Sequence, residues 1–177
     1  DAISNTPAIR DSLSKTAHAA YIMELADRFS IEGEPDRFVF RLLVDTLKRI
    51  NDLSDAFNAL RFFEMRILDQ AGFRPDLINC VDCGRKITAQ DQYFSGTQGG
   101  VVCPACGVLH NRVRKVSMNT LRFMRHFQRS AYPQLAAVSI PPKTQQEMAA
   151  LMANYLSNIL ERKLNAPDFL DQVNRGR

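Results

Sequence analysis

Apolar residues recur at helical spacing in five stretches of the chain. From Ile9 to Phe29, for example, they follow one another mostly three or four positions apart, which places them on one face of an amphipathic helix. The same reasoning predicts five helices, over residues 9–29, 36–50, 55–71, 118–130 and 143–164. We therefore expect a mainly α fold built around a helical bundle.

Two of these helices have the clearest patterns. The helix over residues 55–71 is apolar around more than half of its circumference, so we expect it at the centre of the bundle, with Ser54 as its N-cap and Gly72 as its stop. The helix over residues 143–164 repeats apolar positions at intervals of three and one, and we interpret its Met148 and Met152 as core residues.

The segments between the helices contain turn residues or short strand patterns. Gly33 and Pro35 predict a helix end, Ser117 is a candidate N-cap, and three prolines predict irregular structure over residues 131–142. Strand-like residues 92–95 and 101–102 flank a glycine-rich loop, which predicts a hairpin. The predicted organisation is a linker at 1–8, a bundle at 9–77 and 113–164, an insert at 78–112 and a frayed tail at 165–177.

The chain has four cysteines, arranged as two C-x2-C pairs inside the predicted insert: Cys80, Cys83, Cys103 and Cys106. Thiolates in such pairs are typical ligands of a structural Zn2+ ion, and glycines directly after each pair, Gly84 and Gly107, allow the backbone to fold back toward the sulfurs. The spacing predicts a zinc ribbon around a small hairpin, with one structural zinc ion.

Two disulfides or four free buried thiols are the alternatives to a metal site. Two disulfides would suit a small secreted chain, and nothing in this sequence indicates secretion. Four thiolates leave no open position for a catalytic water, so a catalytic zinc is disfavoured. His110 follows the last cysteine closely and is an alternative ligand, but we expect it to lie on the surface or to pack against the ribbon.

Composition adds a charge asymmetry to this picture. Through Asp91 the chain has 12 Lys and Arg against 15 Asp and Glu, whereas from Gln92 onward it has 11 against 4. The segment between Asp91 and Glu147 contains no acidic residue. A one-sided basic field of this kind attracts polyanions such as DNA or RNA, although a merely solvated basic face is the plainer interpretation.

The basic segment supplies the candidate DNA contacts. On the helix over residues 118–130, three arginines recur at offsets of three and four, on a different stripe from its apolar residues. Such a stripe suits phosphate contacts, which carry no base readout. The candidate residues are Arg112, Arg114, Lys115, Arg122, Arg125 and Arg129.

Two further arginines interrupt the apolar helix over residues 55–71. Arg61 and Arg66 are either solvated or paired with Glu64 or Asp69. Alternatively, Arg61 lies at the lip of an apolar groove, where it would bind a partner's carboxylate.

The sequence gives no support for an enzyme or a membrane protein. It has no glycine-rich phosphate loop, no serine or cysteine nucleophile with a partner histidine, and no clustered carboxylates. No window has the length and apolarity of a membrane span, which favours a soluble intracellular setting. The chain begins with Asp1, and we expect it to be a piece of a longer protein.

Three segments together resemble the RecO family of bacterial recombination mediators. They are AAYIMELADRF (Ala19–Phe29), LRFFEMRILDQAGFRPDL (Leu60–Leu77) followed by CVDCG, and YFSGTQGGVVCPACG (Tyr93–Gly107). The order of helices and ribbon is similar to the C-terminal part of that family, and the likeness covers nearly the whole chain.

The resemblance implies a function in the bacterial cytoplasm, at the nucleoid. Its elements are binding of single- and double-stranded DNA, strand annealing, contact with the tail of the single-stranded DNA-binding protein, and association with RecR to load RecA. It also places Arg61 where that tail is expected to bind. Family members begin with an OB-fold, which this chain lacks, so the alternative function is a protein-interaction zinc-ribbon domain without intrinsic DNA binding.

Overall fold

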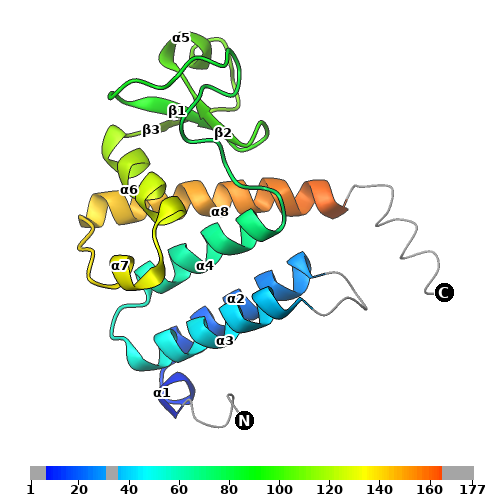
Figure 1. The fold of residues 1–177 in the computed structure, drawn as a ribbon, viewed down its shortest axis with the longest axis vertical. Coiled ribbons are helices and arrows are strands. Elements are labelled where there is room, and N and C mark those ends of the chain that lie inside the picture. The colour runs from blue at the N-terminus through cyan, green and yellow to red at the C-terminus, as the bar shows by residue number, and fades with distance from the viewer. Residues whose placement is uncertain (1–6, 31–35, 165–177) are drawn as a thin grey trace, which may run out of the picture. The chain divides into compact units, whose positions relative to one another are not determined.

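The computed structural model describes residues 7–30 and 36–164 (Figure 1). The chain forms two compact units. The first unit contains the described residues through Arg74 together with His126–Ile140, and the second contains Pro75–Arg125 and the described residues from Pro141 onward. The predicted helix end at 31–35, the linker residues 1–6 and the tail at 165–177 lie outside the described residues.

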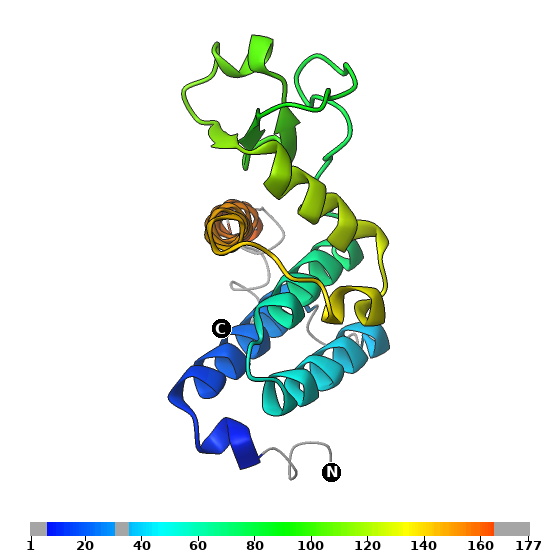
Figure 2. The same cartoon turned by 90° about the vertical axis from the view of Figure 1, so that its left-hand side faces the viewer.

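The first unit is a helical bundle. Helix α3 packs against both α2 and α4, and the short helices α1 and α7 pack on α2 and α4 respectively (Figures 1 and 2). The helices are α1 (Pro7–Arg10), α2 (Leu13–Phe29), α3 (Arg37–Asp52), α4 (Phe57–Gln70) and α7 (Tyr132–Ala136). Every α4 residue from Ala59 to Met65 is buried, as are Ile67 and Leu68, so the prediction that this helix is central to the bundle is confirmed.

Local capping explains where these helices begin and end. Asp36 Oδ1 accepts hydrogen bonds from the Phe38 and Val39 N–H groups at 2.8 and 3.1 Å, which starts α3. At the end of α4, Gly72 adopts φ +77° and the Phe73 N–H donates to the Leu68 carbonyl at 2.8 Å. Gly72 therefore ends α4, as predicted.

Two details of the helix predictions were wrong. The helix expected over residues 9–29 is divided into α1 and α2, because Ser12 is extended and its Oγ accepts from the Lys15 N–H at 3.4 Å as a new N-cap. Ser54 does not cap α4. Instead, Asp55 Oδ1 accepts from the Phe57 N–H at 2.9 Å.

The second unit contains a three-stranded antiparallel sheet in the order β2-β1-β3, which lies between the short helix α5 and the long helix α8 (Figure 1). Its elements are β1 (Gln92–Ser95), β2 (Gly100–Val102), α5 (Pro104–Gly107), β3 (Arg114–Val116) and α8 (Pro142–Leu164). Helix α6 (Met118–Arg129) begins in this unit, and its residues from His126 belong to the first. The predicted mainly helical fold with a small hairpin is confirmed.

Aromatic packing joins the sheet to α8. The rings of Phe94 and Tyr155 meet edge to face with centroids 5.5 Å apart, and both are buried. Met148 and Met152 are fully buried, which confirms them as core residues.

Three short elements were not predicted from the sequence: the four-residue helix α5, strand β3 and helix α7. Strand β3 has only three residues, of which Arg114 and Lys115 are exposed, so it shows no alternation of apolar and polar positions. Helix α7 lies in the stretch expected to be irregular. Its Pro133 falls in the first helical turn, where a missing N–H costs no helical hydrogen bond.

Candidate metal centre and basic surface

The four cysteines meet at one point in the second unit. All four are free thiols, and their sulfur atoms lie within 4.8 Å of one another. The Sγ atoms of Cys83 and Cys103 are 3.8 Å apart. A tetrahedral site with metal–sulfur bonds of about 2.3 Å has sulfur–sulfur edges of about 3.8 Å, so the donor set fits a four-coordinate metal ion. The cluster could hold such an ion.

Each cysteine pair lies on a turn that is closed by the same backbone hydrogen bond, from the glycine N–H to the carbonyl of the first cysteine. The Gly84 N–H donates to the Cys80 carbonyl, and the Gly107 N–H donates to the Cys103 carbonyl, both at 2.8 Å. Gly84 has φ +74°, which favours glycine.

Gly107 is needed for a different reason from the one predicted. It lies in α5 without a positive φ, and a Cβ atom there would lie 2.2 Å from Cδ2 of Tyr93. The absence of a side chain lets the Tyr93 ring pack directly on the second turn.

Hydrogen bonds to sulfur favour thiolates at part of the cluster. The Cys103 N–H donates to Cys80 Sγ at 3.3 Å, and Arg85 Nε donates to Cys83 Sγ at 3.4 Å. The Arg85 side chain lowers the pKa of Cys83 to about 6, and the Cys106 backbone N–H lowers the pKa of Cys103. The carboxyl group of Asp82 raises the pKa of Cys106.

The segment leading into the first turn is fixed by polar contacts. Asp76 Oδ1 accepts from the Ile78 and Asn79 N–H groups at 2.8 and 2.9 Å. Arg125 Nε of α6 donates to the Leu77 carbonyl at 2.7 Å. His110, the alternative ligand, lies outside the four-sulfur cluster, with its Nε2 3.3 Å from Asp82 Oδ1.

The predicted DNA-contacting residues occupy β3, the segment before it, and α6. Five of the six are exposed: Arg112, Arg114, Lys115, Arg122 and Arg129. Arg122 Nη2 donates to Asn119 Oδ1 at 2.9 Å. Arg125 is half-buried, and its bond to Leu77 gives it a structural role in addition to any contact with a ligand.

The first turn of α6 binds the two acidic residues that border the acid-free segment. Glu147 Oε1 accepts from the Ser117 N–H at 2.7 Å, and its Oε2 lies 2.6 Å from Ser117 Oγ and 2.7 Å from Thr120 Oγ1. Asp91 Oδ1 accepts from the Met118 N–H at 2.9 Å. Ser117 Oγ also accepts from the Thr120 N–H at 3.2 Å, which confirms it as an N-cap.

Carboxylates are favourable at this end of a helix because its free N–H groups carry partial positive charge. No sequence pattern predicts that Asp91 and Glu147 meet α6, since Asp91 lies 27 positions before Met118 and Glu147 lies 30 positions after Ser117. In the sequence, these two residues are distinguished by their positions at the two ends of the acid-free segment.

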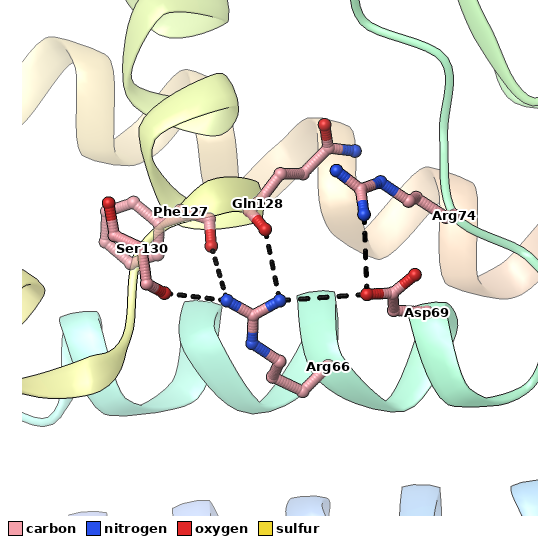
Figure 3. A network of polar contacts seen from close by, with 6 residues as sticks. All are labelled: Arg66, Asp69, Arg74, Phe127, Gln128 and Ser130. Carbon is pink, nitrogen blue, oxygen red and sulfur yellow. Dashed lines mark hydrogen bonds and ion pairs between the residues drawn. The ribbon is translucent and has the colours of Figure 1, made fainter.

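In the first unit, Arg66 of α4 binds the last turn of α6 (Figure 3). Its Nη2 donates to the Ser130 carbonyl at 2.7 Å and the Phe127 carbonyl at 3.4 Å, and its Nη1 donates to the Gln128 carbonyl at 3.1 Å. Its Nη1 also lies 3.7 Å from Asp69 Oδ2, the ion pair that was one predicted alternative.

Arg61, the predicted partner-binding residue, is 7% exposed. Its Nη2 lies 2.6 Å from Glu64 Oε1, which also accepts from the Tyr21 hydroxyl at 2.6 Å. Arg61 is therefore paired with Glu64, which was one of the alternatives considered. Its contact with a partner's carboxylate stays a prediction.

The fold and site define a class of helical proteins with a small sheet and a four-thiol cluster that could hold a metal ion. The family model described as "Recombination protein O C terminal" matches residues 10–168, so the chain belongs to the RecO family. It is 34% identical to the DNA repair protein RecO of Desulforamulus reducens over 165 residues, which are 93% of this chain and 64% of that protein. It is 30% identical to the DNA repair protein RecO of Dehalococcoides mccartyi over 167 residues, which are 94% of this chain and 66% of that protein.

The chain thus spans slightly less than two thirds of the length of these relatives. Within residues 7–30 and 36–164, none of the helices combines the length and apolar character needed to cross a membrane.

Proposed function

We propose that this chain is a non-catalytic module of a DNA repair and recombination mediator that binds single- and double-stranded DNA. One observation carries the proposal: the acid-free segment between Asp91 and Glu147 exposes cations on β3 and α6. Phosphate contacts of this kind give salt-dependent binding without base preference. Strand annealing and RecA loading together with RecR, in the bacterial cytoplasm, are the roles that family membership supports.

A charge-reversal experiment tests DNA binding. We expect Arg122→Glu, Arg125→Glu and Arg129→Glu together to weaken binding of a labelled oligonucleotide at least about tenfold, because each change replaces a phosphate contact with repulsion. Fluorescence anisotropy across a salt series measures both the affinity and the salt slope.

Because Arg125 also donates to the Leu77 carbonyl, its replacement could weaken DNA binding by disturbing the fold. The double variant Arg122→Glu and Arg129→Glu keeps that hydrogen bond and tests the effect of charge alone. Arg28→Glu with Arg41→Glu on α2 and α3 is the matched control outside the basic segment. Parental affinity in the double variant would show that these arginines form only a solvated face.

We further propose that the metal is one structural Zn2+ per chain, held by Cys80, Cys83, Cys103 and Cys106. Four thiolates suit zinc, and this closed donor set supplies folding energy rather than catalysis. Metal analysis of freshly purified protein is expected to give about one zinc per chain. Disulfides in unoxidised material would contradict the assignment.

The second candidate function is a protein-interaction domain without intrinsic DNA binding. A groove between α2 and α3 in the first unit favours it: exposed Met23, Phe38 and Phe40 lie there beside Arg37, Arg41 and Lys48, and the lining also includes Asp27, Asp36 and Asp45. Exposed apolar side chains among charges of both signs suit an amphipathic partner segment, and the candidate is the acidic, apolar-ended tail of the single-stranded DNA-binding protein, with its acidic groups on the three cations. Binding of a labelled tail peptide without any DNA binding at low salt would favour this function.

A further inference from the structure

Among the described residues of the second unit, the two most exposed large apolar side chains are neighbours in the chain. Val108 is 71% exposed and Leu109 is 78% exposed, directly after the second cysteine turn. Scattered single apolar residues are ordinary on protein surfaces, but two adjacent aliphatic side chains on a tight turn form a small apolar projection. We refer to Val108 and Leu109 as the ribbon tip.

The tip is held in place by the backbone. The Leu109 N–H donates to the Cys106 carbonyl at 2.9 Å, and the His110 N–H donates to the Gly107 carbonyl at 3.3 Å. His110 then meets Asp82 on the first cysteine turn. The two side chains are therefore presented by a fixed turn, so binding at the tip requires little ordering of the protein.

The segment that carries the tip has an excess of exposed cations. Between residues 80 and 116 the exposed acidic residues are Asp82 and Asp91, and the exposed cations are Arg85, Lys86, Arg112, Arg114 and Lys115. The nearest acidic group along either cysteine turn, Asp82, is engaged by His110. The ligand that complements the tip thus carries negative charge and also exposes flat or apolar groups.

Single-stranded DNA has both properties. Its phosphates are anionic, and its unpaired bases expose faces that are buried by stacking in a duplex. Aliphatic side chains can insert between neighbouring bases, as in proteins that unstack base steps. We propose that Val108 and Leu109 contact unstacked bases of single-stranded DNA while the neighbouring cations bind its phosphates.

This inference rests on the proposed DNA-binding function and adds a preference for single strands, which the arginines of α6 alone do not provide. Contacts with phosphates are made equally on paired and unpaired strands. An apolar contact with base faces distinguishes the two.

The test replaces both tip residues by serine and compares binding of a single-stranded oligonucleotide containing 2-aminopurine with binding of its duplex. We expect Val108→Ser with Leu109→Ser to weaken single-strand binding by about five- to tenfold, to abolish the change in 2-aminopurine fluorescence, and to leave duplex binding and the salt slope unchanged. Leu13→Ser, at an apolar residue of α2 that is 89% exposed, is the matched control.

A second variant gives a direct signal without removing the apolar group. The chain contains no tryptophan, so Leu109→Trp introduces a single fluorophore at the tip. Its emission is expected to be quenched by single-stranded DNA through stacking and to change little with duplex, whereas Leu13→Trp responds to neither.

The outcomes separate this inference from the function on which it rests. Parental single-strand binding by the serine variant, an equal loss on single strand and duplex, or an unresponsive Leu109→Trp would each overturn the tip contact while DNA binding stands. Absence of DNA binding in the parent protein would overturn both. Concentration-dependent dimers lost in the serine variant, with no 2-aminopurine response, would assign the tip to protein contact instead.

Discussion

Arg66 shows how much one side chain can contribute to this structure. It donates to three backbone carbonyls at the end of α6, where donors from outside a helix commonly bind the carbonyls of its last turn. A guanidinium is well suited to this position because the C-terminal end of a helix carries partial negative charge. Its removal would leave partly buried carbonyls without these donors.

We expect Arg66→Met, which keeps an apolar side chain of similar length, to lower the free energy of unfolding by about 1–3 kcal/mol. Urea denaturation followed by circular dichroism measures the change. The matched control is Arg74→Met, since Arg74 is half-exposed and lies 3.6 Å from the same Asp69, and such a surface pair contributes less than about 1 kcal/mol. Equal losses in the two variants would contradict a capping role for Arg66.

At this scale the sequence predicts only near neighbours. The pairing of Arg61 with Glu64 and of Arg66 with Asp69 was accessible, because residues three apart share a helix face. The carbonyls bound by Arg66 lie 61 to 64 positions away and depend on how α6 returns to α4. The cysteines were an exception. A four-coordinate metal ion needs four ligands, so the spacing of the two C-x2-C pairs alone predicts that they meet in the folded chain.

At the scale of whole elements, the position of α6 depends on residues outside that helix. In the second unit, Glu147 of α8 binds the first turn of α6, and this couples the two helices through one carboxylate. Burial raises the pKa of Glu147, but hydrogen bonds from Ser117 and Thr120 outweigh it and hold the pKa below its usual value.

A lowered pKa in the folded state gives stability that is present above the unfolded pKa, about 4.3 for glutamate, and is lost as the pH falls through the folded value. We expect Glu147→Gln to lower stability by about 1–2 kcal/mol at pH 7, and the difference from the parent to shrink as the pH falls below about 4. Unfolding at a series of pH values tests this expectation. Glu161→Gln, at an exposed glutamate of the same helix, is the control, and a pH-independent difference for Glu147→Gln would refute the argument.

Elements with long periodic patterns were predictable, and short ones were not. Helix α8 repeats its apolar positions over several turns, so its burial against a core was evident. Strand β3 has three residues and helix α7 has five. Both are stabilised by contacts with distant parts of the chain, so their own residues show no periodic pattern that predicts them. The division of the first helix at Ser12 was hidden for a related reason, because the apolar spacing continues across the break.

At the scale of the molecule, the two units have different sources of stability. The first has a helical core that includes the fully buried Ile22, Ile50 and Phe63. In the second unit the sheet packs on α8 through the buried Phe94 and Tyr155, but residues 82–86 of the first cysteine turn are all exposed and gain little from apolar burial, so the turns depend on the proposed metal ion.

Removal of the proposed zinc ion is therefore expected to affect the ribbon selectively. Chelation should make the chain susceptible to protease between residues 78 and 112 while most of the helical circular dichroism remains. Cys83→Ser should reproduce this pattern without chelator, and added zinc should reverse it only in the parent. Full protease resistance after verified metal removal would show that the ribbon folds without the ion.

The contact between Gly107 and the ring of Tyr93 has a consequence for how this ribbon can change during evolution. Because a methyl group at position 107 would occupy space filled by the ring, the two positions cannot vary independently. Relatives with a larger residue at position 107 are expected to carry a smaller one at position 93. The first turn, where the space beside Gly84 is open, is restricted by backbone conformation alone and should vary without such compensation.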